Sequence, residues 1–327
     1  PGLTRAMAEA CADWQRRRYG WQVRAEDVHP LPDVMKGLEV AIAHFSKPDS
    51  PVILPTPAYM PFLTVPGILG RATIQVPMVR ADDRYVLDLD GLAAAFRQGG
   101  DLLILCNPYN PVGRVFTRDE LVAVCEVVDH YGGRVFADEI HAPLIYPGYR
   151  HVPYASISET AAEHTLTATS ASKAWNLPGL MCAQLIVSNA EDARALAELH
   201  PFVTHGASNL GVIATTAAYT AGEEWLADVL DYLDGNRREL VRLVDEHLPG
   251  VQFDPPEGTY LAWLDFRELG LGDNPGVLIK ERTGVVLVDG PECGPPGRGH
   301  ARLNFATPRP VLARIVETMA TALRPGG

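Results

Sequence analysis

Residues 102–141 read LLILCNPYNPVGRVFTRDELVAVCEVVDHYGGRVFADEIH, and this stretch decides the fold. It starts with a short apolar run, Leu102–Cys106, which is rich in leucine and typical of a buried strand. A helical stretch follows at Thr117–Tyr131, with Asp119 and Glu120 near its start, and a second apolar run covers Arg134–Ala137. Alternation of strand and helix predicts a mostly parallel sheet with helices on both faces.

The same alternation extends to both sides of this stretch. Further strands are predicted at Pro51–Leu54, Thr165–Thr169 and Ala183–Val187, and helices at 4–19 and 33–45. After about residue 225 the pattern changes, and the predicted order is a helix at Glu223–His247, strands at Tyr260–Asp265, Val285–Val288 and Ala301–Phe305, and a helix at 310–323. We therefore expect an α/β chain with a large domain at 24–225 and a smaller α+β domain at 226–327. The N-terminal helix within 1–23 is expected to pack with the smaller domain.

Composition excludes several classes of protein. The 327 residues are too many for one hydrophobic core, and 47% hydrophobic with 21% charged residues is typical of a folded enzyme. Lys and Arg number 28 against 40 Asp and Glu, so the formal net charge of −12 argues against nucleic acid or an anionic membrane as partner. No apolar run reaches the roughly 18 residues of a membrane span, and no signal peptide precedes the first helix, so we expect a cytoplasmic protein.

Cysteine and histidine usage argues against metal chemistry. The five cysteines are far apart with no CxxC pair, and the ten histidines form no HExxH motif. We expect buried, reduced thiols and no metal site.

Polar residues follow three predicted strands. In an open parallel sheet, ligands bind beyond the carboxyl ends of the strands. Asn110 lies in the loop after the first of these strands, Asp138 and His141 follow the second, and Ser170, Ser172 and Lys173 follow the third. An amide, a carboxylate and a lysine on one rim suit an aldehyde cofactor with a heteroaromatic ring.

Each group has a definite task in that chemistry. Lys173 would form a Schiff base, and Asp138 would bond the protonated ring nitrogen and keep the ring an electron sink. The hydroxyls of Ser170 and Ser172, with backbone N–H groups at a helix N-terminus, could reach a phosphate. Taken singly, each motif is explained as well by a surface lysine, a helix cap or a proline-stiffened loop; together they favour a cofactor site.

Five segments carry a family resemblance: 106–121, 137–156, 169–180, 256–266 and 301–312. They resemble the pyridoxal-phosphate enzymes of the aspartate-aminotransferase fold (fold type I, class I/II), and more narrowly their cystathionine β-lyase-like C–S lyase branch. The sequence DEIH, ending at His141, is similar to the lyase branch, whereas many aminotransferases have Tyr there. Over the whole chain, the resemblance implies pyridoxal phosphate as cofactor, a small amino-acid substrate and a homodimer.

The resemblance also implies a role for each candidate residue. Lys173 would be the Schiff-base lysine, Asp138 the partner of the pyridine nitrogen, and Asn110 a hydrogen-bond partner of the ring oxygen. Arg302 would clamp the substrate carboxylate, and Tyr59 would stack on the pyridine ring. The helix that begins at Val34 and Met35 would hold the phosphate through its N–H groups. The remaining cofactor-binding candidates are His141, Ser170 and Ser172. Trp175 and Asn176 would shape the pocket.

Two departures from the family concern the cover of the site. Family members carry a longer N-terminal part whose Tyr contributes to the phosphate site of the neighbouring subunit, and this sequence begins after that residue. Either a leading segment precedes this sequence or the active site lacks part of its cover. This chain also has Cys293-Gly294 where family members tend to have Phe-Gly.

The leading prediction is a carbon–sulfur β-lyase that cleaves cystathionine or a related cysteine S-conjugate to a thiol, pyruvate and ammonia. An aminotransferase needs the same lysine, aspartate and arginine, so only the resemblance of DEIH and SASKAWN favours the lyase. A non-catalytic regulatory protein that kept the fold is the third reading, and the acidic charge counts against it.

Overall fold

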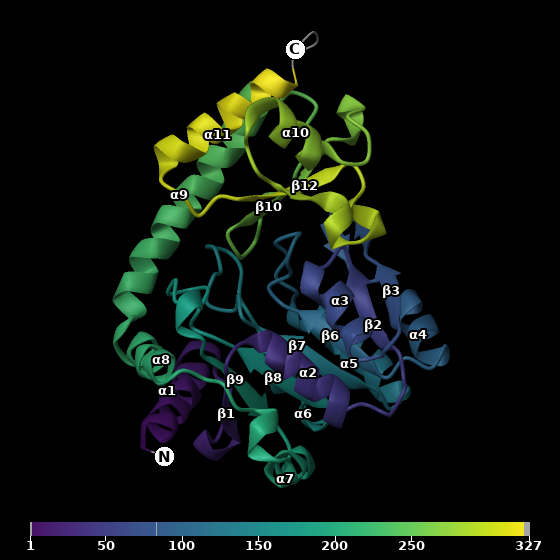
Figure 1. Ribbon diagram of the computed structural model, residues 1–327, viewed down its shortest axis with the longest axis vertical. Coiled ribbons are helices and arrows are strands. Elements are labelled where there is room, and N and C mark those ends of the chain that lie inside the picture. Colours follow the sequence, from purple (N-terminus) through teal and green to yellow (C-terminus); the bar gives the residue numbers. More distant parts are fainter. Residues whose placement is uncertain (1, 83, 324–327) are drawn as a thin grey trace.

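The computed structural model describes residues 2–82 and 84–323. Its largest sheet, among these residues, has seven strands in the order β1-β9-β8-β7-β6-β2-β3 (Figure 1). The strands are β1 (Val28–Leu31), β2 (Val52–Thr56), β3 (Thr73–Pro77), β6 (Leu102–Cys106), β7 (Arg134–Asp138), β8 (Thr165–Thr169) and β9 (Ala183–Val187). The pairs from β3 through β8 are parallel, whereas β9 runs antiparallel to both β8 and β1. The predicted α/β class with a mostly parallel sheet is confirmed.

Helices cover the sheet on both sides, with α2 in front of the strands in Figure 1. The helices that accompany this sheet are α1 (Gly2–Tyr19), α2 (Val34–His44), α3 (Met60–Ile68), α4 (Leu89–Arg97), α5 (Arg118–His130), α6 (Glu159–Glu163), α7 (Ala190–Glu198) and α8 (Asn209–Ala221). Double coverage explains why β2, β6, β8 and β9 are buried along their whole length. At α5, the Thr117 side chain accepts from the N–H of Glu120 and the Glu120 side chain accepts from the N–H of Thr117.

A smaller antiparallel sheet lies at the C-terminal end, in the order β10-β12-β11. Its elements are β10 (Leu261–Asp265), β11 (Val288–Asp289), β12 (His300–Asn304), α10 (Pro275–Thr283) and α11 (Arg309–Ala322). The strand predicted at Val285–Val288 is wrong in extent, because only Val288 and Asp289 pair with β12 and Val286 is 71% exposed.

One continuous helix, α9 (Glu223–His247), joins the two parts of the molecule. It starts next to α8, runs along one side of the molecule and packs against α11 (Figure 1). The domain boundary expected at residues 225 and 226 therefore falls inside a helix and not in a loop.

Helix α1 makes its largest contact with α8, beside the large sheet. Trp14 stacks on Tyr219 with ring centroids 5.8 Å apart and meets the edge of Trp175 at 5.2 Å. The buried residues of α1 also belong to one apolar cluster with residues of α9 and of the small sheet.

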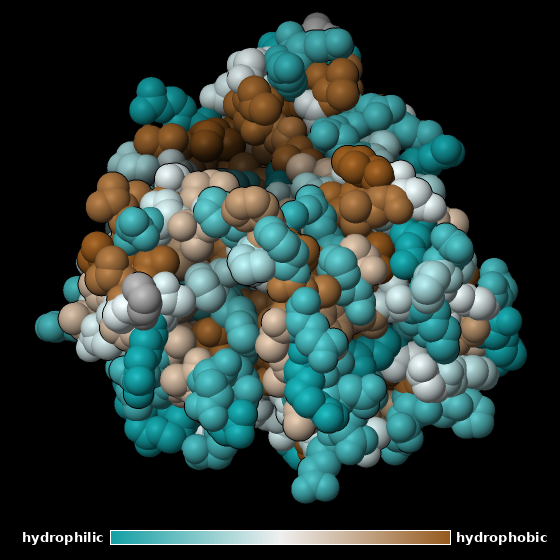
Figure 2. All heavy atoms as spheres, turned by 60° about the horizontal axis from the view of Figure 1, so that its bottom comes forward, coloured by the Kyte–Doolittle hydropathy of each residue, from teal (hydrophilic) through white to brown (hydrophobic). Residues whose placement is uncertain are grey.

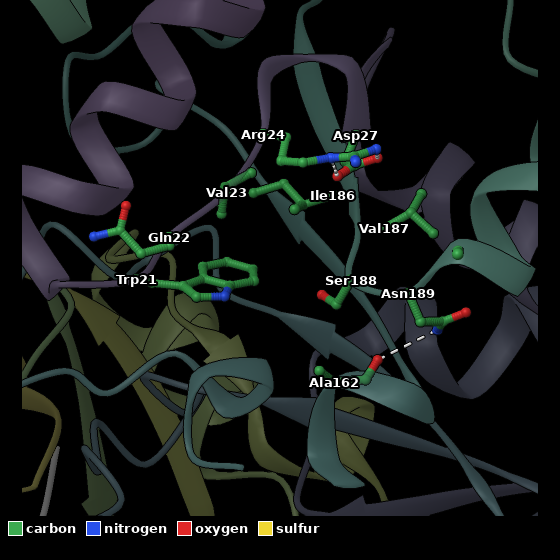
Figure 3. Close-up of a pocket in the computed structure, with 11 residues that line it drawn as sticks. Trp21, Gln22, Val23, Arg24, Asp27, Ala162, Ile186, Val187, Ser188 and Asn189 are labelled. Atoms are coloured by element: carbon green, nitrogen blue, oxygen red, sulfur yellow. Dashed lines mark hydrogen bonds and ion pairs between the residues drawn. The ribbon is translucent and has the colours of Figure 1, made fainter. Parts of the chain in front are cut away.

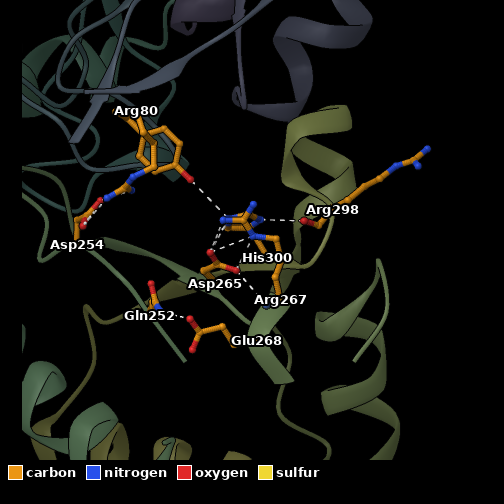
Figure 4. A network of polar contacts seen from close by, with 9 residues as sticks. Arg80, Gln252, Asp254, Asp265, Arg267, Glu268, Arg298 and His300 are labelled. Carbon is orange, nitrogen blue, oxygen red and sulfur yellow. Dashed lines mark hydrogen bonds and ion pairs between the residues drawn. The ribbon is translucent and has the colours of Figure 1, made fainter. Parts of the chain in front are cut away.

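A polar network ties a hairpin, β4 (Val79–Ala81) with β5 (Arg84–Val86), to the small sheet (Figure 4). The Tyr85 hydroxyl lies 3.5 Å from Nε2 of His300, and Arg80 pairs with Asp254 at 2.8 Å. The His300 ring stacks on Trp263, with centroids 5.2 Å apart. These contacts hold the two parts of the molecule together on one side of the gap between them.

The surface seen in Figure 2 is uneven in character. Apolar side chains gather around a recess in the upper half of that view, whereas the lower half is mainly polar. In the described part of the chain, no helix combines the length and the apolar character that crossing a membrane requires.

Candidate active site

A cavity of about 530 Å³ opens at the carboxyl ends of β6, β7 and β8, where β12 approaches the large sheet. Its size lies in the range typical of small-molecule sites. Ten predicted site residues line this cavity: Val34, Met35, Tyr59, Asn110, Asp138, His141, Ser170, Ser172, Lys173 and Arg302. Trp175 and Asn176, which were expected to shape the pocket, are not among its lining residues. The three adjacent strands bring the amide, the carboxylate and the lysine together as the loop positions predicted.

Asp138 is the last residue of β7 and is 3% exposed. Its Oδ1 accepts the N–H of Ile140 at 3.0 Å, and its other oxygen receives no hydrogen bond from a described residue. Burial raises the pKa of Asp138 to about 6, although the Ile140 N–H and the charge of Lys173 act in the opposite direction. A buried carboxylate with an open oxygen fits a cationic N–H donor in the cavity.

Lys173 lies in the loop after β8 and is half-buried. Its amine makes no hydrogen bond or ion pair with any of the residues described. The amine is thus available within the cavity, close enough to Asp138 to favour the ionised carboxylate.

Arg302 projects from β12 into the same cavity and connects the two sheets. Its Nη1 donates to Oδ1 of Asn110 at 2.8 Å, and no carboxylate of the described chain pairs with it. Burial lowers the pKa of Arg302, because a guanidinium without a counter-ion is costly to desolvate. The guanidinium fits a substrate carboxylate, and Asn110 keeps its amide NH₂ for a second partner.

His141 is 4% exposed, and its Nδ1 has no hydrogen-bond partner among the described residues. Burial first, and then the charges of Lys173 and Arg302, lower the pKa of His141 to about 3. Its ring meets the edge of Tyr260 at 5.9 Å. His141 is therefore a neutral imidazole with an unused ring nitrogen on the wall of the cavity.

The opposite end of the cavity is formed by the start of α2. Asp33 caps this helix by accepting the N–H of Lys36 at 2.8 Å. The first N–H groups of the helix, on Val34 and Met35, have no partner within it and suit an anion.

The two serines differ from each other. The Ser170 hydroxyl donates to the carbonyl of Cys182 at 2.7 Å and accepts the N–H of Ser172 at 3.0 Å. Its single proton is committed, so the prediction that this hydroxyl donates to a phosphate is not met in this conformation. The Ser172 hydroxyl has no hydrogen-bond partner in the described chain and remains a donor for the phosphate.

Sequence reasoning missed several residues of the site. The cavity is also lined by Cys106, Ile140, Tyr260 and Asn304, whereas Cys293, in the loop that departs from the family, is buried and outside the lining. Tyr260 stands in the segment EGTY, which by itself is explained as a turn before a strand. No sequence motif marks Cys106, Ile140 or Asn304 as residues of a ligand site.

A buried ion pair supports the loop that carries Asn110. Nε of Arg114 lies 3.0 Å from Oε2 of Glu257, which also accepts the N–H of Val115 at 2.7 Å. The next turn contains Thr259, a β-branched residue at φ +69°. This backbone conformation is strained, and two hydrogen bonds hold it. The N–H of Thr259 donates to the carbonyl of Leu144, and the carbonyl of Thr259 accepts from the Tyr146 hydroxyl. The ion pair joins residues 143 apart in the chain, so no spacing pattern could reveal it.

A second cavity, of about 370 Å³, lies near Trp21 and the start of α7 (Figure 3). Its only lining cation, Arg24, is paired with Asp27, and no lysine lines it. Across residues 2–82 and 84–323, no three His, Cys, Asp or Glu side chains are grouped so as to hold a metal ion. The chemistry therefore belongs to the cavity at the strand ends.

A free lysine, an open carboxylate and an unpaired arginine at the rim of such a sheet define an enzyme class that uses an aldehyde cofactor with a basic ring. The family model for aminotransferases of class I and II matches residues 2–319, and the chain belongs to this family. The protein is therefore an enzyme of a pyridoxal-phosphate-dependent family.

Relatives and solved structures agree with this assignment. The chain is 39% identical to a cystathionine β-lyase of Corynebacterium glutamicum, over 97% of this chain and 83% of the relative. A putative PLP-dependent β-cystathionase of Corynebacterium diphtheriae superposes with a TM-score of 0.92 at 40% identity, covering 97% of this chain and 82% of that one. A PLP-bound C–S lyase of Staphylococcus hominis gives 0.91 at 28% identity, covering 98% and 84%.

The residues present fit pyridoxal phosphate. An aldehyde, a ring nitrogen and a phosphate would meet, in turn, the amine of Lys173, the open oxygen of Asp138 and the N-terminus of α2. Besides Lys173, Arg302 is the one cation among the described residues that line the cavity, so it stays available for a substrate carboxylate.

Proposed function

We propose that this enzyme is a pyridoxal-phosphate-dependent carbon–sulfur β-lyase that cleaves cystathionine or a related cysteine S-conjugate to a thiol, pyruvate and ammonia. One observation carries the proposal: a lysine, a carboxylate and an arginine, each lacking the partner that its chemistry requires, line a single cavity. The choice of a lyase is supported by the 39% identity to the cystathionine β-lyase of Corynebacterium glutamicum.

Bound pyridoxal phosphate supplies an aldehyde that joins to amines and a protonated ring that takes up the electron pair of a carbanion. Lys173 would hold the cofactor through its amine and would act as the base for the proton on the substrate Cα. The carboxylate of Asp138 would keep the proton on the ring nitrogen. Tyr59, Val34, Met35 and Ser172 line the same cavity, where Tyr59 would contact the ring and the other three would donate to the phosphate.

Arg302 orients the substrate. Its guanidinium binds the α-carboxylate through two parallel hydrogen bonds, and Asn110 fixes the guanidinium plane from the other side. With the carboxylate held there, the substrate Cα would lie near the amine of Lys173, which lines the same cavity. His141 stays neutral and adds no charge to the cavity wall.

The test is whether pyruvate and ammonia form from cystathionine without an added keto acid to accept the amino group. Purified holoenzyme incubated with cystathionine should release pyruvate and ammonia in equal amounts with no keto acid added. An aminotransferase, which uses the same three residues, would require an α-keto acid and would release no ammonia. Conversion of cystathionine to its own keto acid, with no pyruvate and only when an acceptor keto acid is supplied, would refute the lyase proposal.

We predict that Arg302→Lys raises KM much more than it lowers kcat. A lysine keeps the charge but loses the bidentate geometry and the bond to Asn110. Loss of a charge-assisted hydrogen bond corresponds to a rise in KM of roughly 10- to 100-fold. Steady-state kinetics with cystathionine measure this, with Arg298→Lys, an exposed arginine of the preceding loop, as control. An unchanged KM would exclude Arg302 as the carboxylate clamp.

We further propose that the enzyme is a homodimer. Exposed apolar side chains near the start of α8 support this, since Phe202 is 75%, Leu210 69% and Ile213 48% exposed. Light scattering on the purified protein should give twice the chain mass of 35.5 kDa. A monomer mass would contradict the proposal.

We also propose the two expected domains, 24–225 and 226–327, divided within α9. Limited proteolysis tests this division.

We further propose a cytoplasmic location. All five cysteines are free and buried, which is typical of a reducing compartment. Cell fractionation tests this location.

A further inference from the structure

Asp138 is followed directly by a second buried carboxylate. Asp138 is 3% and Glu139 1% exposed, and both stand at the end of β7. Two ionised carboxylates in a water-poor interior repel each other, and the charge of Glu139 is one of the causes that raise the pKa of Asp138. An ionised Asp138 therefore requires that the charge of Glu139 be compensated.

The partners of Glu139 provide such compensation. Its Oε1 accepts the N–H of Tyr154 at 2.8 Å, and its Oε2 lies 3.1 Å from Nε2 of His151. His151 is only 2% exposed, and its ring meets the edge of Tyr19 at 5.1 Å. The histidine is thus fixed in place, with one ring nitrogen directed at the carboxylate.

Resting on the proposed function, we infer that His151 is a positioning residue that acts as the counter-ion of Glu139, so that Asp138 faces the cofactor ring beside a neutral pair and not beside a second negative charge. His151 touches neither cofactor nor substrate. It acts through Glu139, on the side of β7 away from the active-site cavity, because successive side chains of a strand point to opposite faces.

Other charged and titratable groups around the pair are few. Asp138 interacts with Lys173, Cys106 and Tyr59, which all belong to the active-site wall. On the other side, Tyr19 packs on His151, while Arg118 and Arg150 line a separate cavity of about 530 Å³ that His151 also borders. Neither arginine makes an ion pair with Glu139 in the described chain. His151 is therefore the basic side chain in direct contact with Glu139 in the described chain.

The test uses charge changes of opposite sign. His151→Gln keeps a donor for Glu139 but leaves its charge uncompensated, so the acid limb of the kcat/KM profile should move to higher pH. Glu139→Gln removes the charge, so the acid limb should move to lower pH. Each shift should be on the order of one pH unit, the size expected for buried charges on neighbouring residues. The pH midpoint of the absorption band of the bound cofactor should move in the same directions, independently of turnover.

The double variant, with both residues changed to Gln, should return close to the wild-type midpoints, because the pair is again neutral. It also preserves the test if His151→Gln fails to fold. His164→Gln is the matched control, since His164 is also buried but bonds the hydroxyl of Tyr154 and no carboxylate. Shifts of the same sign in both single variants, or none, would overturn the inference. Because the absorption titration needs only bound cofactor, its result stands even if cystathionine is not the substrate.

Discussion

Lys173→Ala should reduce pyruvate release from cystathionine by at least about a thousandfold, because one side chain acts both as the anchor of the cofactor and as the base that moves the Cα proton. The variant should also lose the near-visible absorption that a lysine-bound cofactor gives. No other lysine lines the described cavity that could take its place. The rate of pyruvate formation at saturating substrate measures the effect.

The control for this variant is Lys280→Ala, which removes an exposed lysine from α10 and should leave turnover unchanged. Circular dichroism of both variants should match the wild type, since the side chain of Lys173 makes no hydrogen bond or ion pair within the described structure. A folded Lys173→Ala protein that turns over cystathionine at a substantial rate, with no added amine, would remove the basis of the proposed mechanism.

Asp138→Asn should lower kcat by roughly a hundred- to a thousandfold, similar to the loss of other preorganised electrostatic contacts in active sites. The asparagine keeps the size of the side chain and accepts the Ile140 N–H, but its neutral oxygen no longer stabilises a charged ring nitrogen. Steady-state kinetics and cofactor retention after dialysis measure the change. Asp192→Asn, a buried aspartate paired with Arg134 far from the cavity, tests for simple loss of stability.

The same carboxylate predicts a pH dependence of cofactor binding. The pKa of Asp138 is raised to about 6 by burial, so without the cofactor the carboxylate is protonated below that pH. A cationic ring nitrogen favours the ionised form, and protonation must therefore oppose binding. Cofactor affinity should fall as the pH drops below about 6 in the wild type and should be insensitive in this range for Asp138→Asn. Parallel curves for both proteins would exclude Asp138 as the partner of the ring.

Local patterns predicted five of the seven strands of the large sheet, and Leu102–Cys106, Thr165–Thr169 and Ala183–Val187 have the predicted bounds, whereas β1 and β3 were not predicted. These runs are short, apolar and bounded by turn residues, so burial on both faces follows from composition alone. Helix α5 was recognisable from Asp119 and Glu120 near its start, and the structure adds the capping contacts between Thr117 and Glu120. The cavity followed from topology, because neighbouring parallel strands end at one edge.

Other features depend on contacts that no local pattern shows. Helix α3 includes Pro66 within its turns, and the helical propensity of α8 is low because of its Thr and Gly residues. Tertiary packing against the sheet and α1 forms these helices in spite of their composition. The Arg114–Glu257 pair and the commitment of the Ser170 hydroxyl to Cys182 join segments that only the folded chain brings together.

Helix α9 has a mechanical consequence. A continuous helix of 25 residues is rigid, so the two parts of the molecule are joined by a stiff connection and not by a flexible linker. A small tilt of α9 at its N-terminal end, next to α8, would become a larger displacement at the small sheet. That sheet carries Arg302, which donates to Asn110 in the loop after β6. The contacts Arg302–Asn110, Tyr85–His300 and Arg80–Asp254 therefore join two parts that this helix already connects rigidly.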